Sequence, residues 1–412
     1  MRTMRNEREK QKERIIRDCL EGRKTEFAAS ADLGVSIRQI AKLKAKLKKD
    51  GTLLHGNCGR KPITTIPDAA VEIILDEFDA YNGKLLNFKH FGEILCEDLD
   101  IKISYSALRN LLIKNGRKSP KQHRKTQKKK HPTRERKEFF GELLQIDGTP
   151  FDWFGTGKLQ CLHVVMDDNR GVVTGLNMAK NECKQGYFEC LSQTFMNYGV
   201  PKALYGDGMK FLFGDGKKEP TIEEQLAGIP VAQTQFARDM EALNIHLYRA
   251  HSPQAKGRVE RKNGTFQGRL VAEFYRYGVK NMKQANEFFK WWLPKHNAQF
   301  GVNADSQSVF SEVPANVDLD YILSHKEIRT LDSGGVFSLN GYKFQALGLR
   351  NCKITVAINK RYGLKACFKG KYYDILPICE GKKKIAPSDS VKAIIDKFVA
   401  FYTLKNEHSS SA

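Results

Sequence analysis

Three acidic residues stand in short phrases whose composition suits chemistry with metal ions. Asp147 lies in LLQIDGTPF, Asp207 lies in ALYGDGMKF, and Glu260 lies in GRVERKNGTFQ. The first two phrases predict strands that run into an acidic residue, and the third predicts a helix. Carboxylates are preferred ligands of Mg²⁺, and a pair of divalent ions serves both the attacking and the leaving oxygen of a phosphodiester. The three residues therefore predict a site for two Mg²⁺ or Mn²⁺ ions that performs phosphoryl transfer on nucleic acid.

Each carboxylate taken alone has a simpler explanation. An Asp before Gly is usually a turn residue, and a Glu among Arg and Lys usually belongs to a surface ion pair. Their joint occurrence, in the order strand, strand, helix, favours the metal site. In this interpretation Asp147 bridges both ions, Asp207 binds one and Glu260 binds the other. The neighbouring pair Asp167 and Asp168 fits the turn of a hairpin.

The segment around these residues has the element order of one α/β domain. Across residues 139–300 the hydrophobic pattern predicts the order β-β-β-α-β-α-β-α-α, which is that of a ribonuclease-H-like fold. One long helix is expected from about Gln254 through Tyr277. The composition of residues 214–230 indicates a surface insertion. Three basic residues near the predicted ions are expected to contact DNA phosphates: Lys256, Arg258 and Lys262.

The chain is strongly basic, which indicates a polyanionic partner. Its 412 residues carry a formal net charge of +22, a balance typical of proteins that bind nucleic acid. The stretch from Arg117 to Lys137 holds eleven Lys and Arg against one Glu. We interpret residues 117–138 as a basic linker along a phosphate backbone, with contacts from Lys128, Lys129 and Lys130. A merely solvated linker is the alternative.

Residues 1–60 predict a helix-turn-helix unit that binds DNA. Gly34 supplies a tight turn, and Ser36 caps a third helix that ends at Gly51. The polar face of this helix is expected to read the major groove through Arg38, Gln39, Lys42 and Lys46. The following linker is expected to enter the minor groove through Arg60 and Lys61. The alternatives are a generic three-helix bundle and a plain flexible connector.

Two further regions complete a multidomain chain. Residues 61–116 predict a second helix-turn-helix-like unit, in which Ser104 or Ser106 caps a helix that turns Arg109 outward. Residues 315–380 read as short strands with an Asn-Gly turn, which predicts a small β-barrel. Residues 381–412 are expected to form a tail. The sequence thus predicts all-α units, a central α/β core and a C-terminal β domain.

Cysteine usage and hydropathy set the expected environment of the chain. None of the nine cysteines forms a CxxC pair, so no structural zinc site is expected and the thiols suit a reducing compartment. No apolar run approaches the roughly 18–20 residues of a membrane span. We therefore expect a cytoplasmic, nucleoid-associated protein with no membrane partner.

The motifs resemble those of one known family. QIDGTPFDWF, VVMDDNRG, YGDGMKF and SPQAKGRVERKNGTFQGRL make the chain similar to bacterial insertion-sequence transposases of the DD-E transposase/integrase superfamily, and most of all to the group labelled ISNCY. The resemblance implies Asp147, Asp207 and Glu260 as catalytic residues. It also implies double-stranded DNA partners, namely element terminal repeats and target DNA, and self-association into a dimer or higher multimer. The stretch between Asp207 and Glu260 is longer than is typical of the superfamily, and the 214–230 insertion accounts for the excess.

The expected activity is that of a DNA transposase. It would bind element ends, nick the DNA and join the 3′-hydroxyl ends to target DNA by two-metal phosphoryl transfer. One alternative is a non-catalytic, sequence-specific regulator that uses only residues 1–116. Another is a ribonuclease-H-like nuclease without strand transfer. The intact triad argues against the first alternative, and the paired DNA-reading units argue against the second.

Overall fold

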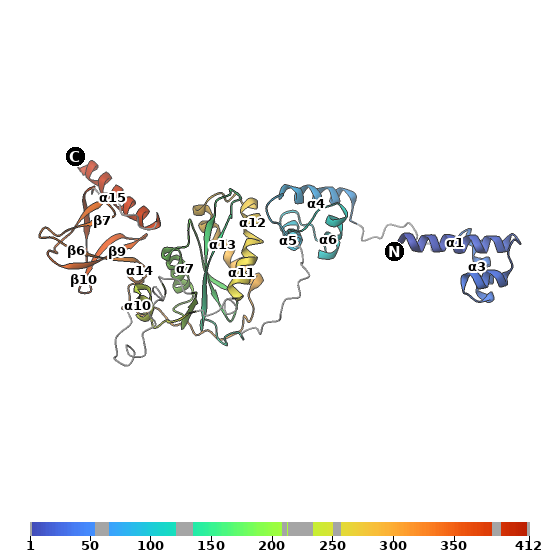
Figure 1. Ribbon diagram of the computed structural model, residues 1–412, viewed down its shortest axis with the longest axis horizontal. Helices are drawn as coiled ribbons and strands as arrows, with labels where there is room; N and C mark the ends of the chain where they lie inside the picture. Colours follow the sequence, from blue (N-terminus) through green and yellow to red (C-terminus); the bar gives the residue numbers. More distant parts are fainter. Residues whose placement is uncertain are drawn as a thin grey trace, which may run out of the picture. The chain divides into compact units, whose positions relative to one another are not determined.

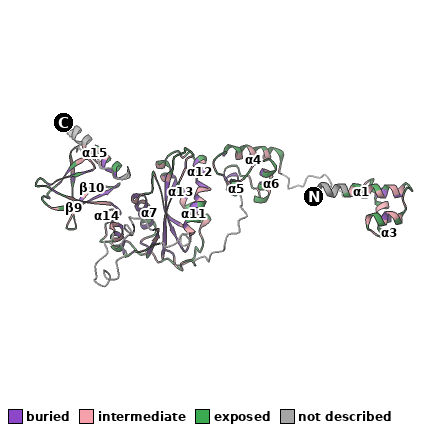
Figure 2. Cartoon of the chain, in the orientation of Figure 1, coloured by how far each residue is buried: buried purple, intermediate pink, exposed green. Residues whose placement is uncertain are grey.

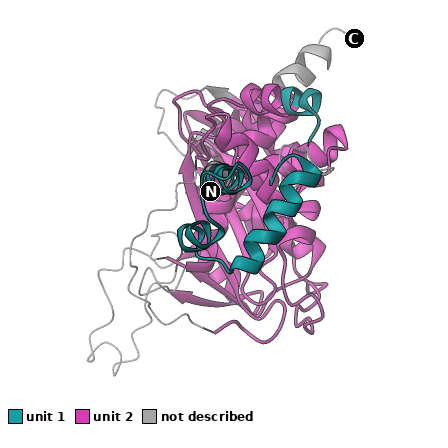
Figure 3. Ribbon diagram, turned by 90° about the vertical axis from the view of Figure 1, so that its right-hand side faces the viewer, with its two compact units in different colours: residues 1–73 teal, residues 74–412 magenta. Residues whose placement is uncertain are grey.

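The computed structural model describes residues 2–53, 66–120, 135–207, 212, 234–249, 257–380 and 389–409 (Figure 1). The chain divides into two compact units, Met1–Ile73 and Ile74–Ala412 (Figure 3). Within the described residues, no helix is both long enough and apolar enough to cross a bilayer. Some predicted features lie outside the described residues: Arg60, Lys61, Lys128, Lys129, Lys130, Lys256 and the 214–230 insertion.

The N-terminal helices form as the capping signals predict. They are α1 (Arg2–Leu20), α2 (Glu26–Leu33) and α3 (Ile37–Asp50). Ser36 Oγ accepts a hydrogen bond from the Gln39 amide, and Gly34 ends α2 with φ 61°, a conformation that favours glycine. The residues predicted to read DNA are all exposed on α3: Arg38, Gln39, Lys42 and Lys46. Their contact with DNA stays a prediction.

A second helical unit comprises α4 (Asp68–Ala80), α5 (Phe88–Leu99) and α6 (Tyr105–Lys114). Ser104, rather than Ser106, caps α6 and accepts from the Ala107 amide at 3.2 Å. Arg109 is exposed on α6, as predicted. The core of the unit consists of Phe91, Ile94, Leu95, Leu108 and Leu112.

A five-stranded sheet forms the centre of the larger compact unit, Ile74–Ala412. Its strands are β1 (Leu144–Phe151), β2 (Gln160–Asp167), β3 (Val173–Ala179), β4 (Ala203–Gly206) and β5 (His246–Arg249). They lie in the order β3-β2-β1-β4-β5. β1, β2 and β3 are antiparallel, whereas β4 and β5 run parallel to β1. This is the topology expected of a ribonuclease-H-like fold.

Helices cover both faces of this sheet, because the strands carry apolar side chains on both faces. α7 (Lys184–Asn197) and α10 (Gln235–Glu241) share one hydrophobic core with Leu144 and Ile146. α11 (Gly257–Gln267), α12 (Leu270–Arg276) and α13 (Met282–Phe300) share the other core with Leu162, Val164 and Met166. Figure 2 shows this buried centre in purple. The expected single helix from Gln254 to Tyr277 is wrong, because the chain turns at Gly268 and Arg269 between α11 and α12.

The C-terminal region forms two small sheets around one core. After α14 (Leu319–Ile322), the strands are β6 (His325–Thr330), β7 (Val336–Leu339), β8 (Tyr342–Ala346), β9 (Lys353–Asn359), β10 (Gly363–Phe368), β11 (Lys371–Tyr373) and β12 (Ile375–Glu380). They pair as β11-β10-β9-β6 and as β12-β8-β7, so a closed barrel is not confirmed. The predicted Asn-Gly turn joins β7 to β8, with positive φ at both residues. α15 (Asp389–Ser409) adds Val391, Ile394 and Ile395 to the core.

Candidate active site

Asp147 and Asp207 belong to neighbouring parallel strands of the sheet. The sequence predicted that the first strand ends at Asp147, but β1 continues to Phe151, so Asp147 lies within it. β1 pairs with β4 in the register Leu144 to Leu204 and Gln145 to Tyr205, and Asp207 directly follows β4. Continuing this register by two residues places Asp207 level with Asp147. Adjacent strands are about 4.7–4.9 Å apart, and paired residues of parallel strands point to the same face. The sheet therefore brings these two carboxylates close together.

α11 is attached to β1 by three regularly spaced hydrogen bonds. The Val259 amide donates to Gln145 Oε1 at 3.2 Å, Asn263 Nδ2 donates to Asp147 Oδ2 at 2.7 Å, and Gln267 Nε2 donates to Thr149 Oγ1 at 3.1 Å. Four helical residues advance about 6 Å and two strand residues about 6.6 Å. Helix and strand therefore stay in step over these contacts, which we call the α11–β1 ladder. Asp147 lies at its middle contact.

Glu260 is exposed in the first turn of α11. It precedes Asn263 by three residues, so the two side chains are neighbours on the helix surface. Among the described residues, no group of three His, Cys, Asp or Glu side chains lies close enough to share one metal ion. The structure thus places the two aspartates on adjacent strands and Glu260 on the attached helix. The assignment of all three as metal ligands stays a prediction.

The surroundings of Asp147 suit a hard cation. Its carboxylate and those of Asp207 and Glu260 offer oxygen donors, which Mg²⁺ and Mn²⁺ prefer. Asn263 Oδ1 is buried and accepts no hydrogen bond within the described part of the chain. A buried carbonyl oxygen without a donor is costly unless a water or a cation satisfies it. The residues present therefore fit a divalent ion at this end of the sheet.

A buried acidic turn supports the start of α11. Asp168, between β2 and β3, accepts hydrogen bonds from Gln145 Nε2 at 2.6 Å and from Arg258 Nη1 at 2.7 Å. Asp168 is fully buried and Arg258 nearly so. Since Gln145 also accepts from the Val259 amide, one carboxylate holds both β1 and the first turn of α11. The hairpin turn was predicted from the sequence, but this supporting role was not.

The adjacent Asp167 stabilises the same turn. Its carboxylate accepts hydrogen bonds from the amides of Gly141 at 2.9 Å and Arg170 at 2.6 Å. Burial raises the pKa of Asp167 to about 6, against the opposing effect of these amides. The turn therefore contains one carboxylate that ionises near neutral pH beside one that forms a buried ion pair.

Two of the predicted DNA-contacting residues of α11 are partly directed into the protein. Arg258 forms the ion pair with Asp168. Lys262 is half-buried, with Nζ 5.8 Å from the centre of the Phe300 ring. Burial, followed by the charge of Arg136, lowers the pKa of Lys262 to about 8. Contact of these two residues with DNA stays a prediction.

Gly148, directly after Asp147, is enclosed by α7 and the segment before it. A Cβ at this position would lie 2.6 Å from Glu182 Oε1 and 2.9 Å from the Tyr187 hydroxyl oxygen. Such distances are far shorter than ordinary van der Waals contacts. Asp147 thus directs its carboxylate to the face of the sheet that α11 covers. Gly148, the next residue, leaves room for Glu182 and Tyr187 on the face that α7 covers.

Comparison with known proteins supports the family suggested by the motifs. No profile of a known protein family matches the chain. The transposase of insertion sequence IS1202 from Streptococcus pneumoniae is 34% identical over 352 residues, which span 78% of this chain and 74% of that relative. The protein y4bF of Sinorhizobium fredii, also assigned as a transposase, is 29% identical over 367 residues, or 87% of this chain and 76% of the relative.

Solved structures give more distant likenesses. One is a simian T-cell lymphotropic virus intasome in complex with a PP2A regulatory subunit, with 16% identity, a TM-score of 0.30 and coverage of 69% of this chain and 92% of that one. Another is the HTLV-2 integrase catalytic core with magnesium, with 20% identity, a TM-score of 0.28 and coverage of 41% and 93%. The sequence relationship to the first transposase extends over most of both chains. The chain belongs to the transposases of bacterial insertion sequences.

Proposed function

We propose that this transposase nicks DNA at the ends of its element and joins the 3′-hydroxyls to target DNA, using Asp147, Asp207 and Glu260 as ligands for two divalent ions. The observation that carries the proposal is the α11–β1 ladder. It fastens the helix that bears Glu260 beside Asp147, which is level with Asp207. This arrangement supports a site formed by three carboxylates from a strand, a strand end and a helix, near the end of β4 in the middle of the sheet.

The side chains of the site have separable tasks. Divalent ions, when bound, would activate the nucleophilic oxygen and stabilise the leaving oxygen. Asn263 orients the Asp147 carboxylate through its 2.7 Å hydrogen bond. Water in the nicking step and the 3′-hydroxyl in the joining step supply the attacking oxygens, so the reaction needs no covalent bond to the protein.

The DNA partner in this proposal is double-stranded, in the form of terminal repeats and target. The exposed polar faces of α3 and α6 support it, because Arg38, Lys42 and Arg109 are open to solvent. The net charge of +22 provides the long-range attraction to phosphates. A dimer or higher multimer follows from the need to process two ends, since each chain supplies one set of three carboxylates.

The test replaces each carboxylate with its amide: Asp147→Asn, Asp207→Asn and Glu260→Gln. An amide keeps the shape but is a poor ligand for a hard cation. We expect binding to end DNA to persist while nicking and joining with Mg²⁺ are lost. Asp152→Asn is the matched control, since within the described part of the chain Asp152 accepts hydrogen bonds from the amides of Thr156 and Gly157 in its own turn.

The products of this assay distinguish the alternatives. A triad variant that keeps about a tenth or more of wild-type joining would remove that residue from the site. Cleavage without any joined product in the wild-type protein would indicate a nuclease. End binding without cleavage would indicate a regulator.

A further inference from the structure

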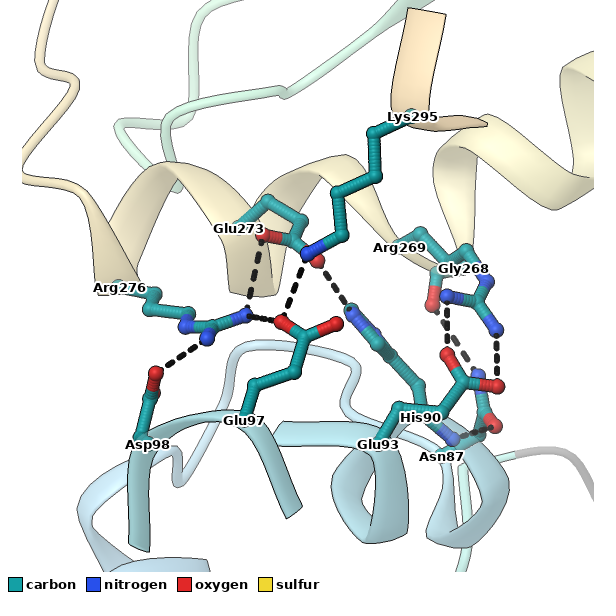
Figure 4. Close-up of polar contacts among 10 residues, drawn as sticks. All are labelled: Asn87, His90, Glu93, Glu97, Asp98, Gly268, Arg269, Glu273, Arg276 and Lys295. Carbon is teal, nitrogen blue, oxygen red and sulfur yellow. Dashed lines mark hydrogen bonds and ion pairs between the residues drawn. The ribbon is translucent and has the colours of Figure 1, made fainter. Parts of the chain in front are cut away.

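The second helical unit contacts the catalytic domain through one face of α5. Figure 4 shows acidic side chains of α5 directed at basic side chains of α12 and α13. The contacting residues, which we call the α5–α12 interface, are His90, Glu93, Glu97 and Asp98 on one side and Arg269, Glu273, Arg276 and Lys295 on the other. Asn87 Nδ2 also donates to the Gly268 carbonyl at 3.3 Å.

The spacing of these residues shows that two helix faces meet. His90, Glu93 and Glu97 recur at intervals of three and four residues, as do Arg269, Glu273 and Arg276, so each set lies on one side of its helix. At the centre, His90 Nε2 lies 2.7 Å from Glu273 Oε1, and both side chains are buried. The interface therefore closes around this pair and excludes water from it.

Ion pairs surround the central contact. The Arg269 guanidinium binds both oxygens of Glu93, at 2.7 and 3.0 Å. Glu97 accepts from Arg276 at 2.9 Å and from Lys295 at 2.7 Å, and Asp98 accepts from Arg276. Burial opposes ionisation of Glu93 and Glu97, yet hydrogen bonds from their basic partners hold the pKa of each below its usual range. Both carboxylates are thus charged at neutral pH.

The interface continues directly into the catalytic helix. Gly268 and Arg269 connect α12 to α11, and their amides donate to the carbonyls of Gly264 and Phe266 in the last turn of α11. Gln267, one residue earlier, forms the last contact of the α11–β1 ladder. Arg269 therefore links α5 to the end of the helix that bears Glu260.

On its other side, α5 packs closely against α6. A Cβ on Gly92 would lie only 3.2 Å from Leu108 Cδ2, so the two helices approach closely at this point. The opposite surface of α6 exposes Arg109 and Asn110. An unbroken series of packed elements thus runs from α6 through α5 and α12 to α11.

We propose that the α5–α12 interface makes the second helical unit act in cis, so that DNA bound by α6 is presented to the active site of the same chain. The proposal rests on the proposed function, because it assigns DNA contact to α6. It is argued from the ion pairs of α5 with α12 and α13 and from the packing of α6 on α5, which connect α6 to the Glu260 helix. The partner of α6 is the duplex adjoining the strand that is cut.

Mixing two full-length variants tests this arrangement. Arg109→Glu disables the α6 surface, and Glu260→Gln disables catalysis. If α6 acts in cis, a mixture of the two variants joins no DNA, because no chain has both functions intact. If the unit acts in trans, the mixture recovers joining, and the proposal is overturned. Different affinity tags on the two chains, retained together on end DNA, establish that mixed multimers have formed.

Two controls separate this proposal from the proposed function. Wild type mixed with Arg109→Glu should still join one end, which shows that mixed multimers are competent. Full joining by Arg109→Glu alone would show that α6 does not place the DNA, and the cis proposal would then be wrong. Loss of joining in Glu260→Gln would still support the proposed catalytic role.

A charge exchange tests the interface itself. We expect Glu93→Arg and Arg269→Glu each to lower joining by about tenfold while end binding persists, because each leaves like charges facing one another. The double variant should recover most of the loss, although not all, since Arg269 also lies over the Phe300 ring at 4.6 Å.

The exposed pair Lys290–Glu287 supplies a matched control. Reversing it should leave joining unchanged, since exposed ion pairs contribute little. Wild-type joining in both single interface variants, or a double variant no better than the singles, would show that the interface does not couple the two regions.

Discussion

The α11–α12 segment makes two contacts of opposite chemical character. Toward the sheet, α11 is held by the ladder of amide, hydroxyl and carboxylate hydrogen bonds around Asp147. Toward the second helical unit, α12 is held by full charges. Hydrogen bonds inside a core respond little to ionic strength, whereas ion pairs near a surface are screened by salt. The position of α11 on the sheet and the docking of α5 are therefore stabilised by different forces and can be disrupted separately.

The largest effect should come from Asp168, which supports the sheet side of this comparison. Asp168→Asn removes the carboxylate charge that faces the nearly buried Arg258 at 2.7 Å, and removal of one partner of a buried ion pair costs about 3–5 kcal/mol in the free energy of unfolding. Chemical denaturation followed by circular dichroism measures it. Adding Arg258→Met should restore part of the loss. A double variant less stable than Asp168→Asn would contradict the ion pair as the cause.

The next effect concerns Asn263, the middle contact of the ladder. Asn263→Ala removes the hydrogen bond to Asp147, and loss of such a supporting contact at a metal ligand typically costs about 10–100-fold in activity. We expect joining to fall by this factor and to recover partly at higher Mg²⁺ concentration. Thr265→Ala is the control, because among the described residues the Thr265 hydroxyl donates to the Arg261 carbonyl of its own helix. An unchanged Mg²⁺ dependence in Asn263→Ala would argue against this role.

Raising the salt concentration should weaken the α5–α12 interface more than the α11–β1 ladder. Between 0.1 and 1 M salt the Debye length falls from about 10 Å to about 3 Å. We expect amide hydrogen exchange in α5 to accelerate over this range while exchange in α11 changes little. Equal acceleration in both helices would mean that α5 and α11 open together, and the proposed difference between the contacts would not hold.

The smallest effect is a pH dependence that arises from Asp167. Its pKa of about 6 in the folded protein exceeds the value of about 3.9 in an unfolded chain. The folded state therefore binds more protons between about pH 4 and pH 6, and this contribution to stability is lost as pH rises through that window. Asp167→Asn should remove the contribution, so the difference in Tm between wild type and variant should change across the window. A constant difference would place the pKa of Asp167 elsewhere.

Much of the fold was accessible from local patterns. Alternating and continuous apolar runs predicted β1 to β5 in chain order. The capping residue Ser36 located the start of α3, and the Asn340-Gly341 pair located the turn between β7 and β8. The same patterns placed Asp207 at a strand end and Glu260 on a helix, although they ended the first strand at Asp147, whereas β1 continues to Phe151. These features depend on short stretches of chain, which a single sequence specifies well.

Contacts between distant segments could not be predicted in this way. Asn263 reads as an ordinary polar residue of a basic helix until β1 is placed beside it, 116 residues away in sequence. The acidic face of α5 reads as a solvated surface, because its basic partners lie in α12 and α13. Helical periodicity identifies a face of a helix but not the partner of that face. The break at Gly268 was missed for a related reason, since the residues around it fit a continuous helical pattern.

The packing of Gly148 has a consequence for how this protein would respond to random mutation. Every other side chain begins with a Cβ, which at this position requires the Glu182 carboxylate and the Tyr187 hydroxyl to move. A survey of all substitutions should therefore find Gly148 sensitive to substitution, as we expect of its neighbour Asp147, although glycine contributes no chemical group. Intolerance at two successive positions would here have two causes, one being the chemistry of a carboxylate and the other the volume of a single methyl group.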